Sequence, residues 1–201
     1  RFLDKTTKYR RQPYILTARN LAFILEYAHA YQVKEYLTYI DETLTHVYYS
    51  PMFDPIEGGI FRQATDYTLQ EPSYELSVYE NANAMILFAT AYRYFKKRIY
   101  KEAAQRIAEF LENSMHIQGK GFFTYTTLNT GSSESAYYKY SLKELRDNFK
   151  ENWESIAKSL GMNLSESAIK MQIISNTPLY WSITHQEIQQ LMRIRQKRHS
   201  E

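Results

Sequence analysis

Cysteine is absent from this chain of 201 residues, and only six glycines and five prolines interrupt it. The absence of cysteine excludes disulfides, thiolate metal sites and thiol chemistry. It leaves the redox compartment open and is compatible with the cytoplasmic location that we predict. The chain also lacks any run of about 18 apolar residues, so we expect no membrane partner.

An excess of charge of one sign is missing as well, because 25 basic and 22 acidic residues leave a net charge of +3. Such a balance does not predict a nucleic-acid surface, and we expect no nucleic-acid partner. Two local basic clusters lie at 96–98 and 193–198. We interpret both as helix ends, where cations complement the helix dipole, with phosphate binding as the alternative.

Motifs for metal, cofactor or nucleophile chemistry are missing too. No two of the five histidines combine metal-ligand spacing with a third acid. The glycines form neither the phosphate-loop nor the dinucleotide pattern, and no Gly-x-Ser-x-Gly elbow surrounds Ser132 and Ser133. We therefore expect no metal ion and no cofactor, and the sequence leaves the catalytic residues unknown.

Tyrosine is what the chain has in excess, with 19 residues against ten Phe and two Trp. A tyrosine packs its ring while its hydroxyl group stays in water. Such residues line a polar groove that stacks sugars or peptides, or they serve half-buried helix packing. Composition alone leaves both interpretations open.

Hydrophobic periodicity predicts two helical hairpins, over 14–50 and 73–116. In each hairpin a helix that is apolar nearly all round, 15–32 or 80–95, comes first. A clean amphipathic helix follows it. A helix that is apolar on every side is buried on most faces, so we expect an inner helix and an outer helix in each hairpin.

A shift of 63 residues brings the two hairpins into register. The matched pairs include Asn20 with Asn83, Leu25 with Phe88, Ala28 with Ala91, Tyr31 with Tyr94, Leu44 with Ile107 and Gly58 with Gly121. An ungapped repeat of this kind predicts a mainly all-α fold, a partial α/α toroid of repeated helical hairpins. A toroid of six such hairpins needs roughly 350 to 400 residues, so this chain holds at most half of one.

Such a half-toroid exposes the surface of its inner helices, which further chain or self-association then covers. Beyond Gly121 we expect a short β-hairpin over 121–140, because two aromatic-rich runs flank a Gly-Ser-Ser turn. Short C-terminal helices follow over 141–198. Their starts carry capping-box pairs: Ser141 with Glu144, Asn163 with Glu166, and Thr184 with Glu187. We treat 1–201 as a single domain.

The stretch 58–82 carries a family resemblance. The residues that carry it are Gly58, Gly59, Arg62, Asp66, Pro72, Glu75, Tyr79, Asn81 and Ala82. Later matches are 121–123, Tyr138, 141–145 and 187–198. The chain thereby resembles, from Pro13 to Arg198, the helical region of the YyaL-like family, the spermatogenesis-associated thioredoxin-domain proteins. That family joins an N-terminal thioredoxin-like domain to an α/α toroid, whose fold is related to N-acylglucosamine 2-epimerases and six-hairpin glycosidases.

Departures from the family pattern bear on activity. The family carries histidines where this chain has Phe61 and Ser73, a lysine at Leu76, and acids near Thr127 and Asn129. The thioredoxin-like domain has no counterpart here, so its redox chemistry does not carry over. Kinship of fold with sugar enzymes is an analogy that does not establish activity.

Five residues of the resembling stretch are candidates for ligand binding: Arg62, Asp66, Glu75, Tyr79 and Asn81. We predict that Ser73 caps a helix that places Glu75 in its first turn and Tyr79 on the same face. Glu75 would then be an acid at the mouth of a funnel. In the alternative, Glu75 complements the helix dipole while a salt bridge between Arg62 and Asp66 orders the connector.

These observations lead to three hypotheses about function. The first is a domain that binds a carbohydrate-like or other polar ligand with little or no catalysis. The second is a helical scaffold that forms a homo-oligomer or docks a thioredoxin-like partner. The third, an active sugar epimerase or glycoside hydrolase, lacks the histidines and acids of the family. A glycoside hydrolase also needs two carboxylates about 5 to 9.5 Å apart, which the sequence does not place.

Overall fold

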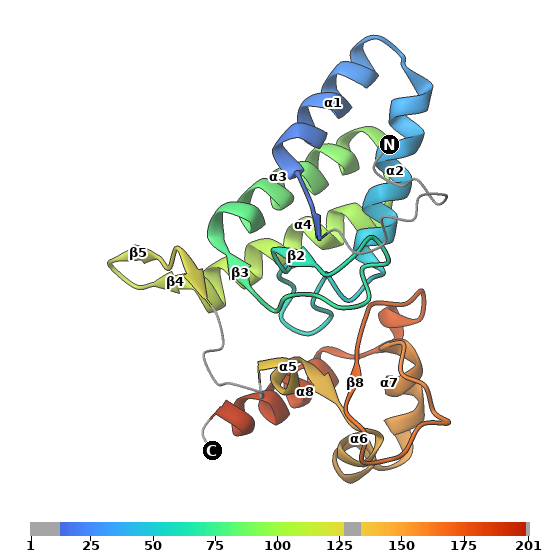
Figure 1. The fold of residues 1–201 in the computed structure, drawn as a ribbon. Coiled ribbons are helices and arrows are strands. Elements are labelled where there is room, and N and C mark those ends of the chain that lie inside the picture. Colours follow the sequence, from blue (N-terminus) through green and yellow to red (C-terminus); the bar gives the residue numbers. More distant parts are fainter. Residues whose placement is uncertain (1–12, 127–133, 200–201) are drawn as a thin grey trace.

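The computed structural model describes residues 13–126 and 134–199, and this part of the chain is mainly helical, as predicted. Residues 13–126 form a first lobe, and residues 134–199 form a second lobe that lies against one end of it (Figure 1). The helices of the first lobe are α1 (Ala18–Ala30), α2 (Lys34–Tyr48), α3 (Val78–Phe95) and α4 (Arg98–Phe110), which a π-helical turn, η1 (Leu111–Met115), extends. Among the described residues, no helix is long and apolar enough to cross a membrane.

The second lobe is built from shorter elements. Its helices are α5 (Glu134–Tyr138), α6 (Leu142–Phe149), α7 (Trp153–Ser159) and α8 (His185–His199), with 3-10 turns η3 (Lys150–Asn152) and η4 (Tyr180–Ser182). Each lobe has its own cluster of buried apolar side chains. Ile56 of the first lobe joins the cluster of the second, and Tyr138 of the second lobe joins the cluster of the first.

All strand pairs in the described residues are antiparallel and two residues long. They are β1 (Tyr14–Ile15) with β2 (Gln63–Ala64), β3 (Leu76–Ser77) with β6 (Tyr125–Thr126), β4 (His116–Ile117) with β5 (Gly121–Phe122), and β7 (Lys139–Tyr140) with β8 (Gln172–Ile173). They fasten connectors to one another and do not form a layer of the fold.

The burial pattern of the helices reproduces the register of 63 residues. The buried positions of α1 are Ala18, Leu21, Leu25 and Ala28, and their equivalents Asn81, Ala84, Phe88 and Ala91 are buried in α3. The buried positions of α2 are Ile40, Thr43, Leu44, Val47 and Tyr48, and their equivalents Ala103, Arg106, Ile107, Phe110 and Leu111 are buried in α4 and η1. The two hairpins are therefore structural repeats, packed side by side through α1 and α3. Closure into a toroid stays a prediction.

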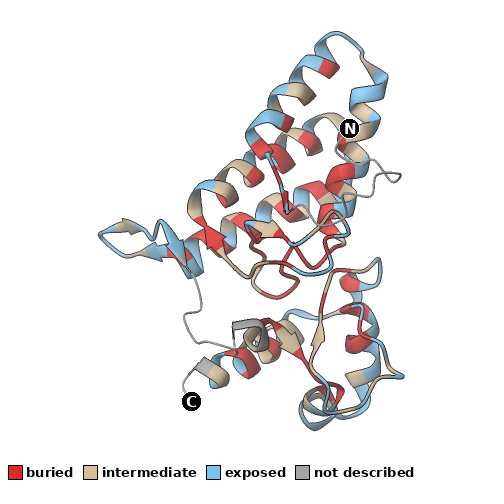
Figure 2. Cartoon of the chain, in the orientation of Figure 1, coloured by how far each residue is buried: buried red, intermediate tan, exposed pale blue. Residues whose placement is uncertain are grey.

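Inner helices are less buried than their composition predicts. Phe23 of α1 is 72% exposed and Ile86 of α3 is 55% exposed. In Figure 2 both helices show blue along one side and red along the other. The reason is geometric. Helix α1 packs on α2 and α3, and α3 packs mainly on α4 and α1, so that one face of each has no covering element among the described residues.

The hairpin predicted over 121–140 is wrong in its pairing. Strand β5 instead closes a short hairpin with β4, which we call the tongue (116–122) and which projects from the first lobe (Figure 1). Strand β6 pairs with β3, residues 134–138 are helical, and β7 pairs with β8. The turn expected at 131–133 lies outside the described residues.

Two of the three predicted capping boxes are present. The Ser141 hydroxyl accepts the amide of Glu144, whose carboxylate accepts the Ser141 amide, and α6 starts there. The same reciprocal pair joins Thr184 and Glu187 at the start of α8. The prediction for Asn163 is wrong, because its side chain accepts the amide of Ser165 in a turn that no helix follows.

Candidate functional site

Arg62 and Glu75 lie side by side at the base of α3. Their backbones are joined by a hydrogen bond of 2.8 Å from the Arg62 amide to the Glu75 carbonyl. Their side chains approach to 3.7 Å between Nη1 of Arg62 and Oε2 of Glu75, and these side chains are 47% and 32% exposed. The hydroxyl group of Tyr125, which is exposed on β6, lies close enough to both side chains for both to act on its pKa. We call Arg62, Glu75 and Tyr125 the ligand group.

Local hydrogen bonding explains how these residues meet. Ser77 pairs with Tyr125 in the β3–β6 ladder, and the Val78 amide donates to the Thr124 carbonyl at 3.2 Å. This ladder carries the segment after the tongue back to the start of α3. Tyr125 therefore reaches Glu75 across a strand pair that joins positions about 50 residues apart in the sequence.

The start of α3 differs from the prediction. Ser77, and not Ser73, caps the helix by accepting the amide of Glu80. Ser73 lies in the connector, where its amide donates to the Gln63 carbonyl at 2.8 Å. Glu75 therefore precedes α3 and lies outside its first turn. The interpretation that Glu75 complements the helix dipole is wrong.

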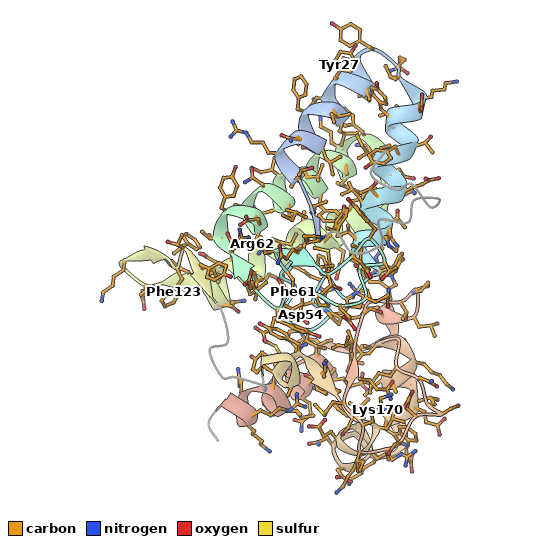
Figure 3. The ribbon with its side chains drawn as sticks, in the orientation of Figure 1. Tyr27, Asp54, Phe61, Arg62, Phe123 and Lys170 are labelled. Atoms are coloured by element: carbon orange, nitrogen blue, oxygen red, sulfur yellow. The ribbon has the colours of Figure 1, made fainter. Side chains whose placement is uncertain are left out.

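Tyr79, another residue of the predicted site, lies close to Glu75 along the chain. It lies in the first turn of α3, two residues after Ser77, and is 59% exposed. Phe122 and Phe123, at the base of the tongue, are also exposed. Figure 3 shows Arg62 at the foot of α3 and Phe123 on the tongue side of it. Exposed aromatic residues therefore lie on the elements next to Arg62 and Glu75, at the start of α3 and in and after β5.

Asp66 and Asn81 have other roles. The Asp66 carboxylate accepts the amide of Thr68 at 2.8 Å and its hydroxyl at 2.5 Å, so it orders its own turn. The predicted alternative salt bridge from Asp66 to Arg62 is replaced by the pair of Arg62 with Glu75. Asn81 is fully buried, which places it away from any exposed ligand surface.

Asn81 fastens the glycine turn to α3. Its Oδ1 accepts the amide of Ile60 at 2.8 Å, while its Nδ2 donates to the carbonyls of Ile60 and Ser77 at 3.0 and 2.9 Å. A buried amide with these three bonds has a structural role. Of the five predicted residues, the structure thus brings together Arg62 and Glu75, with Tyr79 nearby along the chain.

The electrostatics of this group combine one tyrosine hydroxyl with one carboxylate. Loss of hydration and, next, the hydrogen bond to Glu75 raise the pKa of Tyr125, so its hydroxyl stays protonated. The described contacts bring one carboxylate, that of Glu75, to this group. Two carboxylates are needed for the usual acid and base roles in glycoside cleavage.

Two of the positions at which the YyaL-like family carries ionisable residues are occupied here by buried apolar side chains, Phe61 and Leu76. Phe61 is buried, and its ring meets those of Tyr74 and Tyr138 edge to face at 5.2 and 4.8 Å between centroids. Leu76 is buried as well. A histidine or lysine at these positions would have to give up hydration, which explains why apolar residues suit them. Thr127 and Asn129 lie outside the described residues.

The sequence did not predict a second polar cluster, which joins the lobes. Arg195 of α8 is fully buried and donates from Nη1 to Oδ2 of Asp54 at 2.6 Å and from Nη2 to Oδ1 at 2.8 Å. Nη1 also lies 3.3 Å from Oε1 of Glu57. Figure 3 shows Asp54 at the boundary between the lobes. The basic cluster at 193–198 therefore includes a buried ion pair, whereas the sequence predicted a helix end, with phosphate binding as the alternative.

Arg106 and Asn176 extend this cluster. Arg106 donates from Nη2 to the Asp54 carbonyl at 2.9 Å and from Nη1 to Oδ1 of Asn176 at 3.1 Å. Asn176 in turn donates to the Tyr48 carbonyl at 2.8 Å. Burial opposes ionisation of Asp54, but Arg195 and the amides of the turn outweigh it and lower the pKa of that carboxyl. The two terminal nitrogens of Arg195 are bonded within the cluster, while its buried Nε has no hydrogen-bond partner among the described residues.

A shallow depression of about 420 Å³ lies between α2 and α4 and is lined by Asp41, Glu42, Thr45, His46, Tyr49 and Lys97. Its main charges neutralise each other, because Lys97 Nζ lies 2.6 Å from Oδ2 of Asp41. Oδ1 of Asp41 accepts the Tyr100 hydroxyl at 2.6 Å.

Across residues 13–126 and 134–199, no cluster of three or more His, Cys, Asp or Glu side chains could hold a metal ion. No protein-family model matches the chain, and no curated protein matches it significantly.

Proposed function

We propose that this chain is a binding domain that holds a carbohydrate-like polar ligand at the ligand group with little or no catalysis. The observation that carries the proposal is the exposed pairing of Arg62 with Glu75, completed by Tyr125 and bordered by exposed aromatic rings. A guanidinium and a carboxylate offer several directed hydrogen bonds to hydroxyl groups. Exposed rings offer an apolar face on which a sugar ring can stack.

Little or no catalysis is part of the proposal. Glu75 is paired with Arg62, and we assign it the role of a hydrogen-bond acceptor for the ligand. We further propose that the chain belongs with the YyaL-like proteins. The repeat of hairpins at a spacing of 63 residues supports that proposal.

A saccharide screen by ligand-observed NMR and calorimetry tests the binding. The probes are neutral monosaccharides and disaccharides together with N-acetylglucosamine. Where a saccharide binds, Glu75→Gln is expected to weaken it about tenfold or more, because a hydrogen bond to a charged group contributes about 1.5 to 3 kcal/mol. Tyr125→Phe removes one hydroxyl group and is expected to weaken binding less.

The matched control is Glu109→Gln, an exposed acid on α4 that leaves the ligand group intact. It should bind as the wild type does, and circular dichroism should show the same helix content for all variants. Nitrophenyl glycosides should be cleaved no faster than in buffer. The proposal fails if no saccharide binds at millimolar concentration, or if Glu75→Gln and Glu109→Gln bind equally well.

A further inference from the structure

An exposed apolar surface runs along the two inner helices. Its large side chains are Phe23, Tyr27, Tyr31 and Ile86, and we call it the inner-helix face. Tyr27 and Tyr31 lie with ring centroids 4.7 Å apart. Figure 3 shows Tyr27 near the end of the first lobe that is remote from Asp54 and the second lobe, so the second lobe does not cover this surface.

The area of this face approaches what a stable interface requires. Its four large side chains expose roughly 500 Å² in total, since a large aromatic residue carries about 150 to 250 Å². Stable complexes bury about 800 Å² on each partner. Arg19, Asn20 and Arg93 are exposed on the same two helices and provide a polar rim that supplies much of the difference.

The repeat indicates what kind of surface fits this face. Phe23 and Ile86 are equivalent positions at the spacing of 63 residues, and both are exposed. The contact of α1 with α3 is already a contact between two copies of the same repeat. A second copy of the chain presents the same two exposed residues, and a two-fold axis sets the α1 and α3 of one copy against those of the other.

Charge at the face is compatible with pairing of like surfaces. Glu26 of α1 approaches Arg93 of α3 to 3.8 Å and accepts a hydrogen bond from the Tyr94 hydroxyl. Arg19 adds a second cation on α1. Because both signs are present, two copies related by a two-fold axis can set opposite charges against each other.

We propose that the inner-helix face is covered by the same face of a second copy, in a two-fold symmetric dimer. Sedimentation equilibrium of the full chain over a range up to about 100 µM tests this. The wild type is expected to dimerise within that range. Phe23→Glu places a charge at the centre of the interface and is expected to weaken dimerisation about 30-fold or more.

Ile169→Glu is the matched control. Ile169 is 75% exposed and precedes Lys170, which Figure 3 shows at the far end of the second lobe. This variant adds the same charge at an exposed apolar residue and should dimerise as the wild type does. Circular dichroism checks that both variants keep their helices, so a change in mass is not mistaken for unfolding.

A wild type that stays monomeric throughout the range would overturn the proposal and would leave the face to an unrelated protein or to further chain. Equal weakening by both variants, or none by Phe23→Glu, would overturn it as well. The saccharide screen is independent, because Phe23→Glu leaves the ligand group unchanged. A failure of dimerisation is therefore distinguishable from a failure of ligand binding.

Discussion

Replacing Asp54 by asparagine should cost a large part of the stability of this fold. Arg195 is fully buried, so Asp54→Asn removes the counter-charge that it meets through two hydrogen bonds and leaves it the longer contact with Glu57 at 3.3 Å. Breaking a buried ion pair from one side costs about 3 to 5 kcal/mol. A domain has a total stability of about 5 to 15 kcal/mol, so the variant is expected to be folded but weakened.

Urea denaturation with two probes locates the loss. Both tryptophans, Trp153 and Trp181, lie in the second lobe, and the Trp181 ring lies 3.8 Å from the Arg98 guanidinium of α4. Fluorescence therefore reports the second lobe and its contact with the first, while circular dichroism reports the helices of both lobes. In Asp54→Asn the fluorescence midpoint is expected to fall further than the midpoint from circular dichroism.

Companion variants separate the ion pair from other effects. Arg195→Met leaves Asp54 buried with the amides of its turn but without a counter-charge, and is expected to lose a similar amount of stability. The double variant should lose less than the sum of the single losses, because it removes both members of the buried pair. Glu154→Gln, at an exposed pair with Lys158, should stay within about 0.5 kcal/mol of the wild type. The reasoning is refuted if Asp54→Asn loses less than about 1 kcal/mol or if the losses add.

Two further predictions concern pH and the glycine turn. The pKa of Asp54 is lowered in the folded state. Its contribution to the free energy of unfolding is therefore complete above the ordinary aspartate pKa of about 3.9 and is lost as the pH falls through the folded-state pKa. Urea midpoints measured from pH 6 down to about pH 2 should fall less steeply for Asp54→Asn than for the wild type. Gly58 has φ of +91°, and a Cβ there would lie 2.7 Å from the Arg106 carbonyl oxygen, so thermal unfolding of Gly58→Ala should show a loss of about 2 to 4 kcal/mol. Gly119 has φ of +74°, and a Cβ there would have no atom within 4 Å, so Gly119→Ala should lose about 1 kcal/mol. Equal losses for Gly58→Ala and Gly119→Ala would contradict a role for the close contact with Arg106.

Local sequence signals predicted the helices well. The spacing of 63 residues placed both hairpins in register, and the pairs at Ser141 and Thr184 marked two helix starts. These features depend on neighbours within one or two turns, which a sequence pattern contains directly. They were therefore accessible before any tertiary contact was known.

Contacts between distant residues could not be predicted in the same way. Ser73 and Ser77 are equally good caps by composition, and the pairing of Ser77 with Tyr125 accompanies the choice of the second. Asn81 resembled a ligand residue because nothing in the sequence shows that it faces Ile60. The ligand group needed Tyr125, which lies on a strand that the sequence assigned to a different hairpin.

The long separation of Asp54 and Arg195 has a consequence for biosynthesis. The two residues are 141 positions apart. A ribosome that adds about 5 to 20 residues per second makes Arg195 roughly 7 to 28 seconds after Asp54. During that interval both hairpins can form, while the carboxylate of Asp54 stays hydrated because Arg195 has not yet been synthesised. The nascent first lobe therefore presents an unpaired acid beside Ile56, an apolar side chain that the second lobe covers once it has folded.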